Sequence, residues 1–105
     1  MVRGTASDFA LEKDLQAACV RHARKRGWFA RRYKGPGRRS HPDYLFAYRG
    51  AVLWVEFKLP GKEPTALQWV EIREMAGFGL NVVWLDSLDD FKAILAAHGG
   101  PTSCD

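Results

Sequence analysis

The sequence predicts a single mixed α/β domain with its elements in the order α-β-β-β-α-β-α. A length of 105 residues suits one compact domain. The composition, 47% hydrophobic and 27% charged, is that of an ordinary globular protein. Short apolar runs alternate with segments of helical periodicity, which favours a hairpin-built sheet completed by a crossover helix and one more strand. We expect residues 1–98 to form the domain and residues 99–105 to form a flexible tail.

The first half of the chain predicts one helix and three strands. The helix begins at about Ser7 or Asp8 and ends at Gly27, and residues at helical spacing form its apolar stripe: Phe9, Leu11, Leu15, Ala18, Cys19 and His22. Residues 28–33 form a strand that ends at a Gly-Pro-Gly turn. Residues 43–48 and 51–59 form two further strands, and the tight turn Arg49-Gly50 joins them as a hairpin.

The second half predicts two helices around a strand. Thr65 caps the first of these helices, which carries Gln68, Trp69, Ile72, Met75 and Ala76 on one face. Residues 81–85 form a nearly continuous apolar run, which is typical of a buried strand. Ser87 caps a last helix that continues to about His98 and has two acids in its first turn, where the helix dipole favours negative charge.

Positive charge is concentrated in the first half of the chain. Residues 1–58 contain 13 Lys and Arg against five acids, a balance of +8, whereas residues 59–105 contain three against seven, a balance of −4. No acid occurs between Asp14 and Asp43, and that segment carries nine basic residues. A solvated basic face would also explain this pattern. Positive charge concentrated in one half of the chain, however, generates an electrostatic field that favours a polyanionic partner, and we expect nucleic acid.

Several function classes are excluded. The longest apolar run, residues 51–55, is far shorter than the ~20 residues of a membrane helix. No apolar signal-peptide core follows Met1, so we expect a cytoplasmic protein with free thiols at Cys19 and Cys104. The Gly-Pro-Gly turn lacks the Lys-Ser/Thr of a phosphate-binding loop, and the two cysteines lack the spacing of a zinc site.

Charged residues interrupt a strand that is otherwise built for burial. Alternation places Glu56 and Lys58 on one face of residues 51–59, and the Arg49-Gly50 turn brings Asp43 opposite the Glu56 region. The two charges could simply be solvated where the strand ends. Two neighbouring carboxylates repel each other, however, unless a proton or a cation lies between them, and a hard divalent ion suits oxygen ligands. Such an ion can activate water and neutralise charge on a phosphodiester, and Lys58 could position the water or stabilise the extra negative charge.

These residues resemble a known nuclease signature. Pro42-Asp43 followed by Glu56-Phe57-Lys58 is similar to the PD-(D/E)-x-K motif. Glu12 on the first helix, Gln68 on the helix after the motif, and the ending at residues 79–85 resemble the virus-type replication-repair nuclease (VRR-NUC) family over about residues 11–95.

The resemblance implies a restriction-endonuclease-like αβββαβ core, a mixed sheet flanked by helices. It implies that Asp43 and Glu56 bind Mg²⁺ or Mn²⁺ with help from the backbone carbonyl of Phe57, and that Lys58 is catalytic. It also implies that Glu12 approaches the site directly or through water, and that Gln68 lies near it. The chain departs from the family in one place, because Ser40-His41 stands where a Gly is usual before the Pro-Asp pair.

Some roles stay open. Glu12 could be a surface acid of the helix, and Gln68 could serve only a capping box with Thr65. We expect phosphate contacts from the basic strand and loop, and either a phosphate contact or a loop role for His41; the contact residues are Arg31, Arg32, Lys34, Arg38 and Arg39.

The function that combines these features is a metal-dependent, structure-selective DNA endonuclease. The family resemblance suggests a Holliday-junction resolvase-like homodimer that is encoded by a phage or by a bacterial host. The small size of the domain also favours a homodimer. The alternatives are a non-catalytic basic module that binds nucleic acid, and a nuclease, of restriction type or otherwise, that cuts linear duplex DNA.

Overall fold

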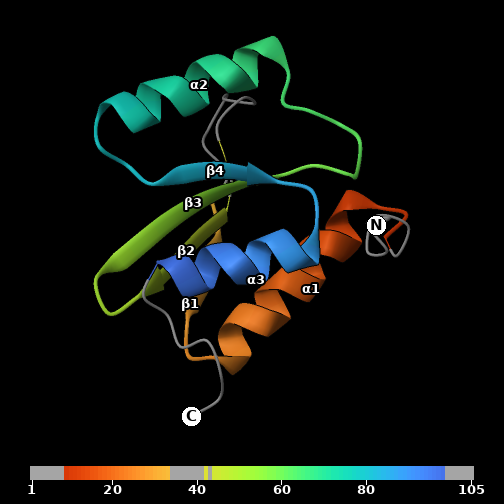
Figure 1. Ribbon diagram of the computed structural model, residues 1–105, viewed down its shortest axis with the longest axis vertical. Helices are drawn as coiled ribbons and strands as arrows, with labels where there is room; N and C mark the ends of the chain where they lie inside the picture. The colour runs from red at the N-terminus through yellow and green to blue at the C-terminus, as the bar shows by residue number, and fades with distance from the viewer. Residues whose placement is uncertain (1–8, 34–41, 43, 99–105) are drawn as a thin grey trace.

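The helices and strands follow the expected order. The computed structural model describes residues 9–33, 42 and 44–98. Within them the elements are α1 (Glu12–Lys25), β1 (Phe29–Arg32), β2 (Tyr44–Tyr48), β3 (Ala51–Phe57), α2 (Ala66–Gly77), β4 (Val82–Leu85) and α3 (Leu88–Ala97) (Figure 1). The mixed α/β class is therefore confirmed.

The four described strands form one sheet in the order β1-β2-β3-β4. β1, β2 and β3 are antiparallel neighbours, whereas β4 is parallel to β3 and is reached through α2. In the β2–β3 hairpin Tyr48 pairs with Ala51, and the turn residues Arg49 and Gly50 have φ angles of 47° and 90°. Positive φ at both central residues is the geometry of the type I′ hairpin turn, so the predicted tight turn is confirmed.

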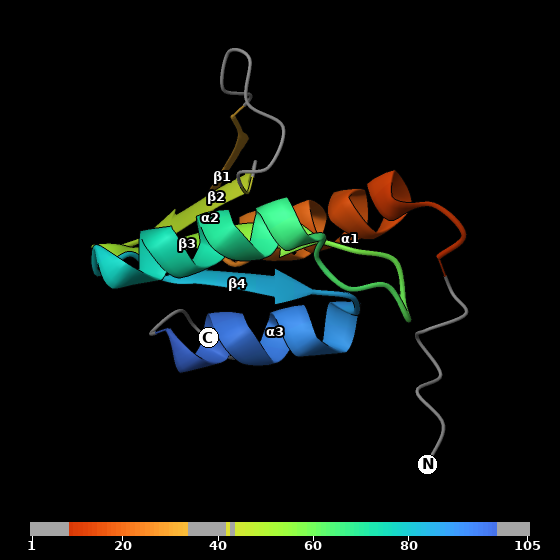
Figure 2. The same cartoon turned by 90° about the horizontal axis from the view of Figure 1, so that it is seen from above.

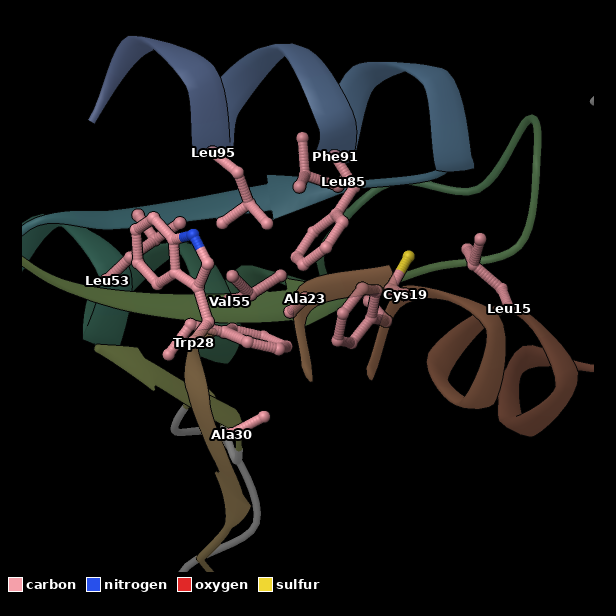
Figure 3. Close-up of a cluster of buried hydrophobic side chains, with 12 residues drawn as sticks. Leu15, Cys19, Ala23, Trp28, Ala30, Leu53, Val55, Leu85, Phe91 and Leu95 are labelled. Atoms are coloured by element: carbon pink, nitrogen blue, oxygen red, sulfur yellow. The ribbon is translucent and has the colours of Figure 1, made fainter. Parts of the chain in front are cut away.

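The sheet lies between two layers of helix, with α2 on one face and α1 with α3 on the other (Figure 1). Most of the core lies on the α1 and α3 face, because alternation directs Phe46, Leu53, Val55 and Phe57 to that side. Phe91 of α3 packs against this group, with its ring centroid 4.9 Å from that of Phe46. Figure 3 shows side chains from both helices and from the strands meeting in this cluster.

The first helix differs from its prediction at its start. It begins at Glu12, and its N-cap is Leu11, whose extended backbone is not accompanied by a side-chain cap bond. Ser7 and Asp8, the expected caps, lie outside the described residues. Leu11 is 51% exposed and does not belong to the buried stripe, which consists of Leu15, Cys19 and Ala23 at four-residue spacing.

The ends of the other elements follow the sequence with small shifts. Thr65 and Ser87 cap α2 and α3 as expected, each accepting a bond from a backbone N–H three residues on. β3 ends at Phe57 rather than at residue 59.

One burial expectation is wrong. β4 lies at an edge of the sheet, so three of its four residues are only half-buried and Leu85 alone is buried. On the face of α2 that carries Gln68 and Trp69, Ile72 is buried and Ala76 is exposed, so the contact of this helix with the sheet is narrow.

Among the described residues, no helix combines the length and the apolar character needed to span a membrane.

Candidate functional site

Glu56 is a buried carboxylate near the end of β3. Only 9% of the residue is exposed. It pairs with Trp84 of β4, and alternation turns it to the α2 face, away from its neighbours Val55 and Phe57 in the main core. Burying a carboxylate is costly without polar partners, so its environment is the first indication of a site.

Gln68 supplies one of those partners. Its Nε2 donates to Oε2 of Glu56 at 3.0 Å, while its Oε1 accepts a bond of 2.8 Å from the backbone N–H of Thr65. The Oγ1 of Thr65 accepts from the Gln68 backbone N–H and completes the capping box. The Gln68 side chain therefore completes the capping box and also links the first turn of α2 to Glu56.

Two tryptophans dock α2 beside this contact. Trp69 of α2 meets Trp84 of β4 edge to face, with ring centroids 6.4 Å apart, and Trp84 is the register partner of Glu56. The guanidinium of Arg73 lies over the Trp69 ring, 5.3 Å from its centroid. Because Trp69 follows Gln68 directly, this packing holds the amide against the carboxylate.

Lys58 is the residue after the last one of β3, and it is half-buried. Its backbone N–H donates to the carbonyl of Leu85 at 2.9 Å, so the pairing with β4 continues for one residue beyond the strand. The backbone position of the lysine is thus tied to the end of the sheet where Glu56 lies.

Phe57 and Glu12 approach this end of the sheet differently. The Phe57 side chain is 1% exposed and belongs to the core on the opposite face, so only its backbone carbonyl could act at the site. Glu12 is the half-buried first residue of α1. In both ribbon views the first turn of α1 lies on the same side of the molecule as the loop that follows β3 (Figures 1 and 2).

The remaining predicted residues divide into two groups. Arg31 and Arg32 are exposed and lie on opposite faces of β1, since Arg31 pairs with Leu45 and Arg32 with Tyr44. The guanidinium of Arg31 lies over the Phe29 ring, 4.9 Å from its centroid. Five residues lie outside the described part of the chain: Lys34, Arg38, Arg39, His41 and Asp43. Within that part no group of three His, Cys, Asp or Glu side chains could hold a metal ion.

One set of basic residues was not assigned from the sequence. Arg21 and Arg24 of α1 line a pocket of about 320 Å³ together with Arg32 and Tyr44. The signal was present as the spacing of Arg21 and Arg24, which puts them on one helical face. Their convergence with Arg32 depends on how α1 packs on the sheet, which the spacing alone does not state.

Comparisons with known proteins place this arrangement in context. No protein-family model matches the chain. The chain is 38% identical over 87 residues to the "Putative nuclease p44" of Acyrthosiphon pisum secondary endosymbiont phage 1, an alignment that spans 82% of this chain and 92% of that protein. A solved structure described as a VRR_NUC domain superimposes with a TM-score of 0.74 at 26% identity, over 84% of this chain and 96% of that one.

Proposed function

The chain belongs to the VRR-NUC family of nucleases, and from that premise we propose that it is a metal-dependent endonuclease that hydrolyses phosphodiester bonds of DNA. The observation that carries the proposal is the buried Glu56 carboxylate, which receives a hydrogen bond from Gln68 and lies two residues from Lys58. A carboxylate and a lysine so placed at the end of a strand are the residue types that phosphodiester hydrolysis with a divalent ion requires.

The donor set suits Mg²⁺ or Mn²⁺. Both ions prefer oxygen ligands, and the Glu56 carboxylate and the Phe57 carbonyl offer oxygens. The Glu56 carboxylate accepts the bond from Gln68 at Oε2.

Asp43 is proposed as the second carboxylate ligand. Asp43 lies outside the described residues, but its neighbour Tyr44 pairs with Val55, the residue before Glu56. The proposal therefore follows from sequence order, because Asp43 is the residue before Tyr44 and Glu56 is the residue after Val55.

The side chains have separate roles in the proposed reaction. A divalent ion supplies a Lewis acid that neutralises negative charge developing on the phosphodiester. Lys58 stabilises the same charge or positions the attacking water. Gln68 orients the Glu56 carboxylate, and Glu12 approaches the site directly or through water.

The basic residues are proposed to hold the nucleic acid. Arg31 and Arg32 project from the two faces of β1, so together they could contact phosphates on both sides of this edge of the sheet. We assign the same role to four residues outside the described part of the chain: Lys34, Arg38, Arg39 and His41.

The protein is proposed to act as a homodimer. The outward side of α2 carries Leu67, 67% exposed, and Val70, 60% exposed, and the helix is followed by Phe78, 83% exposed. The spacing of these residues places them on one stripe, and exposed apolar stripes are typical of protein interfaces. Light scattering after size exclusion should give twice the chain mass, and Val70→Glu with Phe78→Asp should give a monomer. A monomeric parent would contradict the proposed homodimer but not the proposed nuclease activity.

A substrate panel tests the activity. Labelled four-way junction, linear duplex and single strand are each incubated with Mn²⁺, Mg²⁺ or EDTA. Metal-dependent nicking that favours the junction supports a structure-selective resolvase. Cleavage of linear duplex at the same rate as the junction would support nuclease activity and contradict the proposed junction preference. Tight binding without cleavage of any substrate would contradict the proposal and identify a binding module.

A further inference from the structure

A basic pocket lies on the α1 face of the sheet, the face opposite to that of Glu56. It measures about 320 Å³, and α1, β1 and β2 all contribute to it; its lining residues are Ala17, Val20, Arg21, Arg24, Arg32 and Tyr44. We propose that this pocket binds a phosphate of the nucleic acid backbone and so anchors the substrate away from the reacting bond. The inference rests on the proposed function in assuming a nucleic acid substrate.

The pocket is formed by the packing of one helical face on two strands. Arg21 and Arg24 follow Ala17 and Val20 at spacings that put all four on one side of α1. Arg32 is paired with Tyr44 across β1 and β2, so these two side chains share the face that α1 covers. Small Ala17 leaves room at the helix surface, and volume is consequently available between the arginines.

Arg24 is held in place by the sheet. Its Nη2 donates to the carbonyl of Ala30 in β1 at 2.8 Å. A guanidinium has five N–H donors, so this bond fixes the group and leaves donors for a ligand. A donor fixed before binding loses less entropy when the ligand arrives.

The ligand class follows from charge and shape. Three arginines line a pocket of this size, and no acid occurs in the sequence between Asp14 and Asp43. Guanidinium forks match the oxygens of a phosphate in pairs, which makes arginine the residue of choice for phosphate recognition.

The position of the pocket links it to Glu56. Tyr44 pairs with Arg32 on one side and with Val55 on the other, and Val55 is the residue before Glu56. The pocket and Glu56 therefore lie near the same end of the sheet, on its two faces. A nucleic acid that reaches Glu56 around the β1 edge can place a second phosphate in the pocket.

The test is a binding measurement that does not depend on cleavage. Labelled DNA is titrated in EDTA by fluorescence anisotropy at several salt concentrations, with all variants in a Lys58→Ala background. Arg21→Gln and Arg24→Gln should each weaken binding about fivefold or more, and the double variant more than tenfold. The slope of log K against log salt should fall by about one for each phosphate that the variant no longer neutralises.

Matched variants separate the pocket from general charge. Arg49→Gln removes the same charge from the exposed β2–β3 turn, at the other end of the sheet from Tyr44 and Glu56, and should change the affinity less than twofold. Arg21→Lys keeps the positive charge but lacks the paired N–H donors of a guanidinium, so its affinity for DNA should lie between those of Arg21→Gln and the parent. Arg24→Gln also removes the hydrogen bond to Ala30, so the melting temperature of each variant is measured. If Arg24→Gln unfolds the protein, the result for Arg21→Gln alone decides the test.

A second titration distinguishes nucleic acid from free phosphate. Inorganic phosphate is added by calorimetry at constant ionic strength to the parent and to the double variant. Binding of phosphate by the parent, with DNA affinity unchanged in the double variant, would overturn the proposal and leave a small-anion site. Equal DNA affinities for the parent, Arg21→Gln and Arg49→Gln would also overturn it. If the protein with Lys58 intact cleaves no DNA with Mn²⁺ or Mg²⁺, while Arg21→Gln still weakens DNA binding, the nuclease is contradicted and the phosphate pocket is supported.

Discussion

Replacing Gln68 by alanine removes two hydrogen bonds at once, because the same side chain completes the capping box of α2 and donates to Glu56. The capping contact is exposed and contributes about 1 kcal/mol. The bond to the buried carboxylate contributes about 1.5–3 kcal/mol, because a charged acceptor is left short of a donor. We expect Gln68→Ala to lower the free energy of unfolding by about 2–4 kcal/mol.

Two companion variants separate these contributions. Thr65→Ala removes the Oγ1 acceptor of the capping box but leaves the bond between Gln68 and Glu56 in place. It should lower the free energy of unfolding by about 1 kcal/mol. Gln68→Glu keeps the capping box, since glutamate is an ordinary partner at that position, but places a second carboxylate where the amide lay 3.0 Å from Oε2 of Glu56. Two charges about 4 Å apart repel by about 1–4 kcal/mol, depending on solvent screening.

The pH dependence of Gln68→Glu has a defined sign. Repulsion raises the folded-state pKa of one carboxyl above the unfolded value of about 4.3. The destabilisation is therefore present at neutral pH and is relieved as the pH falls through the raised pKa towards 4.3.

Urea denaturation at pH 7.5 and pH 5, in EDTA, measures all three variants against the parent. If Gln68→Ala were no less stable than Thr65→Ala, the contact with Glu56 would contribute nothing. If Gln68→Glu matched the parent at pH 7.5, the inferred proximity of the two carboxylates would be wrong.

Three further predictions concern the core and its titratable groups. Phe91 is fully buried and packs on Phe46, so Phe91→Ala should cost about 3–5 kcal/mol by urea denaturation, whereas alanine at exposed Lys92 should cost less than about 0.5 kcal/mol. Burial raises the pKa of the Cys19 thiol to about 12, so in a Cys104→Ser background it should resist alkylation at pH 8.5 until urea unfolds the protein; rapid labelling of folded protein would contradict this. Burial, and then the charges of Arg26 and Lys92, lower the pKa of His22, so protonation favours the unfolded state and stability should fall as the pH drops below about 6.5. His22→Gln should flatten the melting temperature between pH 7 and pH 5, and an unchanged slope would refute the assignment.

The order of elements was predictable because local signals agreed. The Arg49-Gly50 turn, the caps Thr65 and Ser87, and the alternation in β3 each specify their own short segment. The face of Glu56 followed from alternation once the register of β3 was known. The resemblance to the VRR-NUC family added the fold and is confirmed by the structural similarity.

What the sequence missed depends on packing between distant elements. An apolar run predicts a buried strand, but only the order of strands in the sheet shows that β4 lies at an edge. Leu11 fits the helical period, yet the helix begins after it and its side chain stays exposed. The pocket of Arg21, Arg24 and Arg32 needs the docking of α1 on β1, which no local pattern encodes.

The most direct measurement compares metal-dependent cleavage by the parent, Lys58→Ala and Lys62→Ala. Lys62 is an exposed lysine in the loop after β3, so its variant carries the same chemical change outside the site. With Mn²⁺ or Mg²⁺ we expect the parent and Lys62→Ala to cleave DNA at equal rates, and Lys58→Ala to be slower by about 100-fold or more. Undiminished cleavage by folded Lys58→Ala, or cleavage by the parent in EDTA, would contradict a metal-dependent nuclease centred on Glu56 and Lys58.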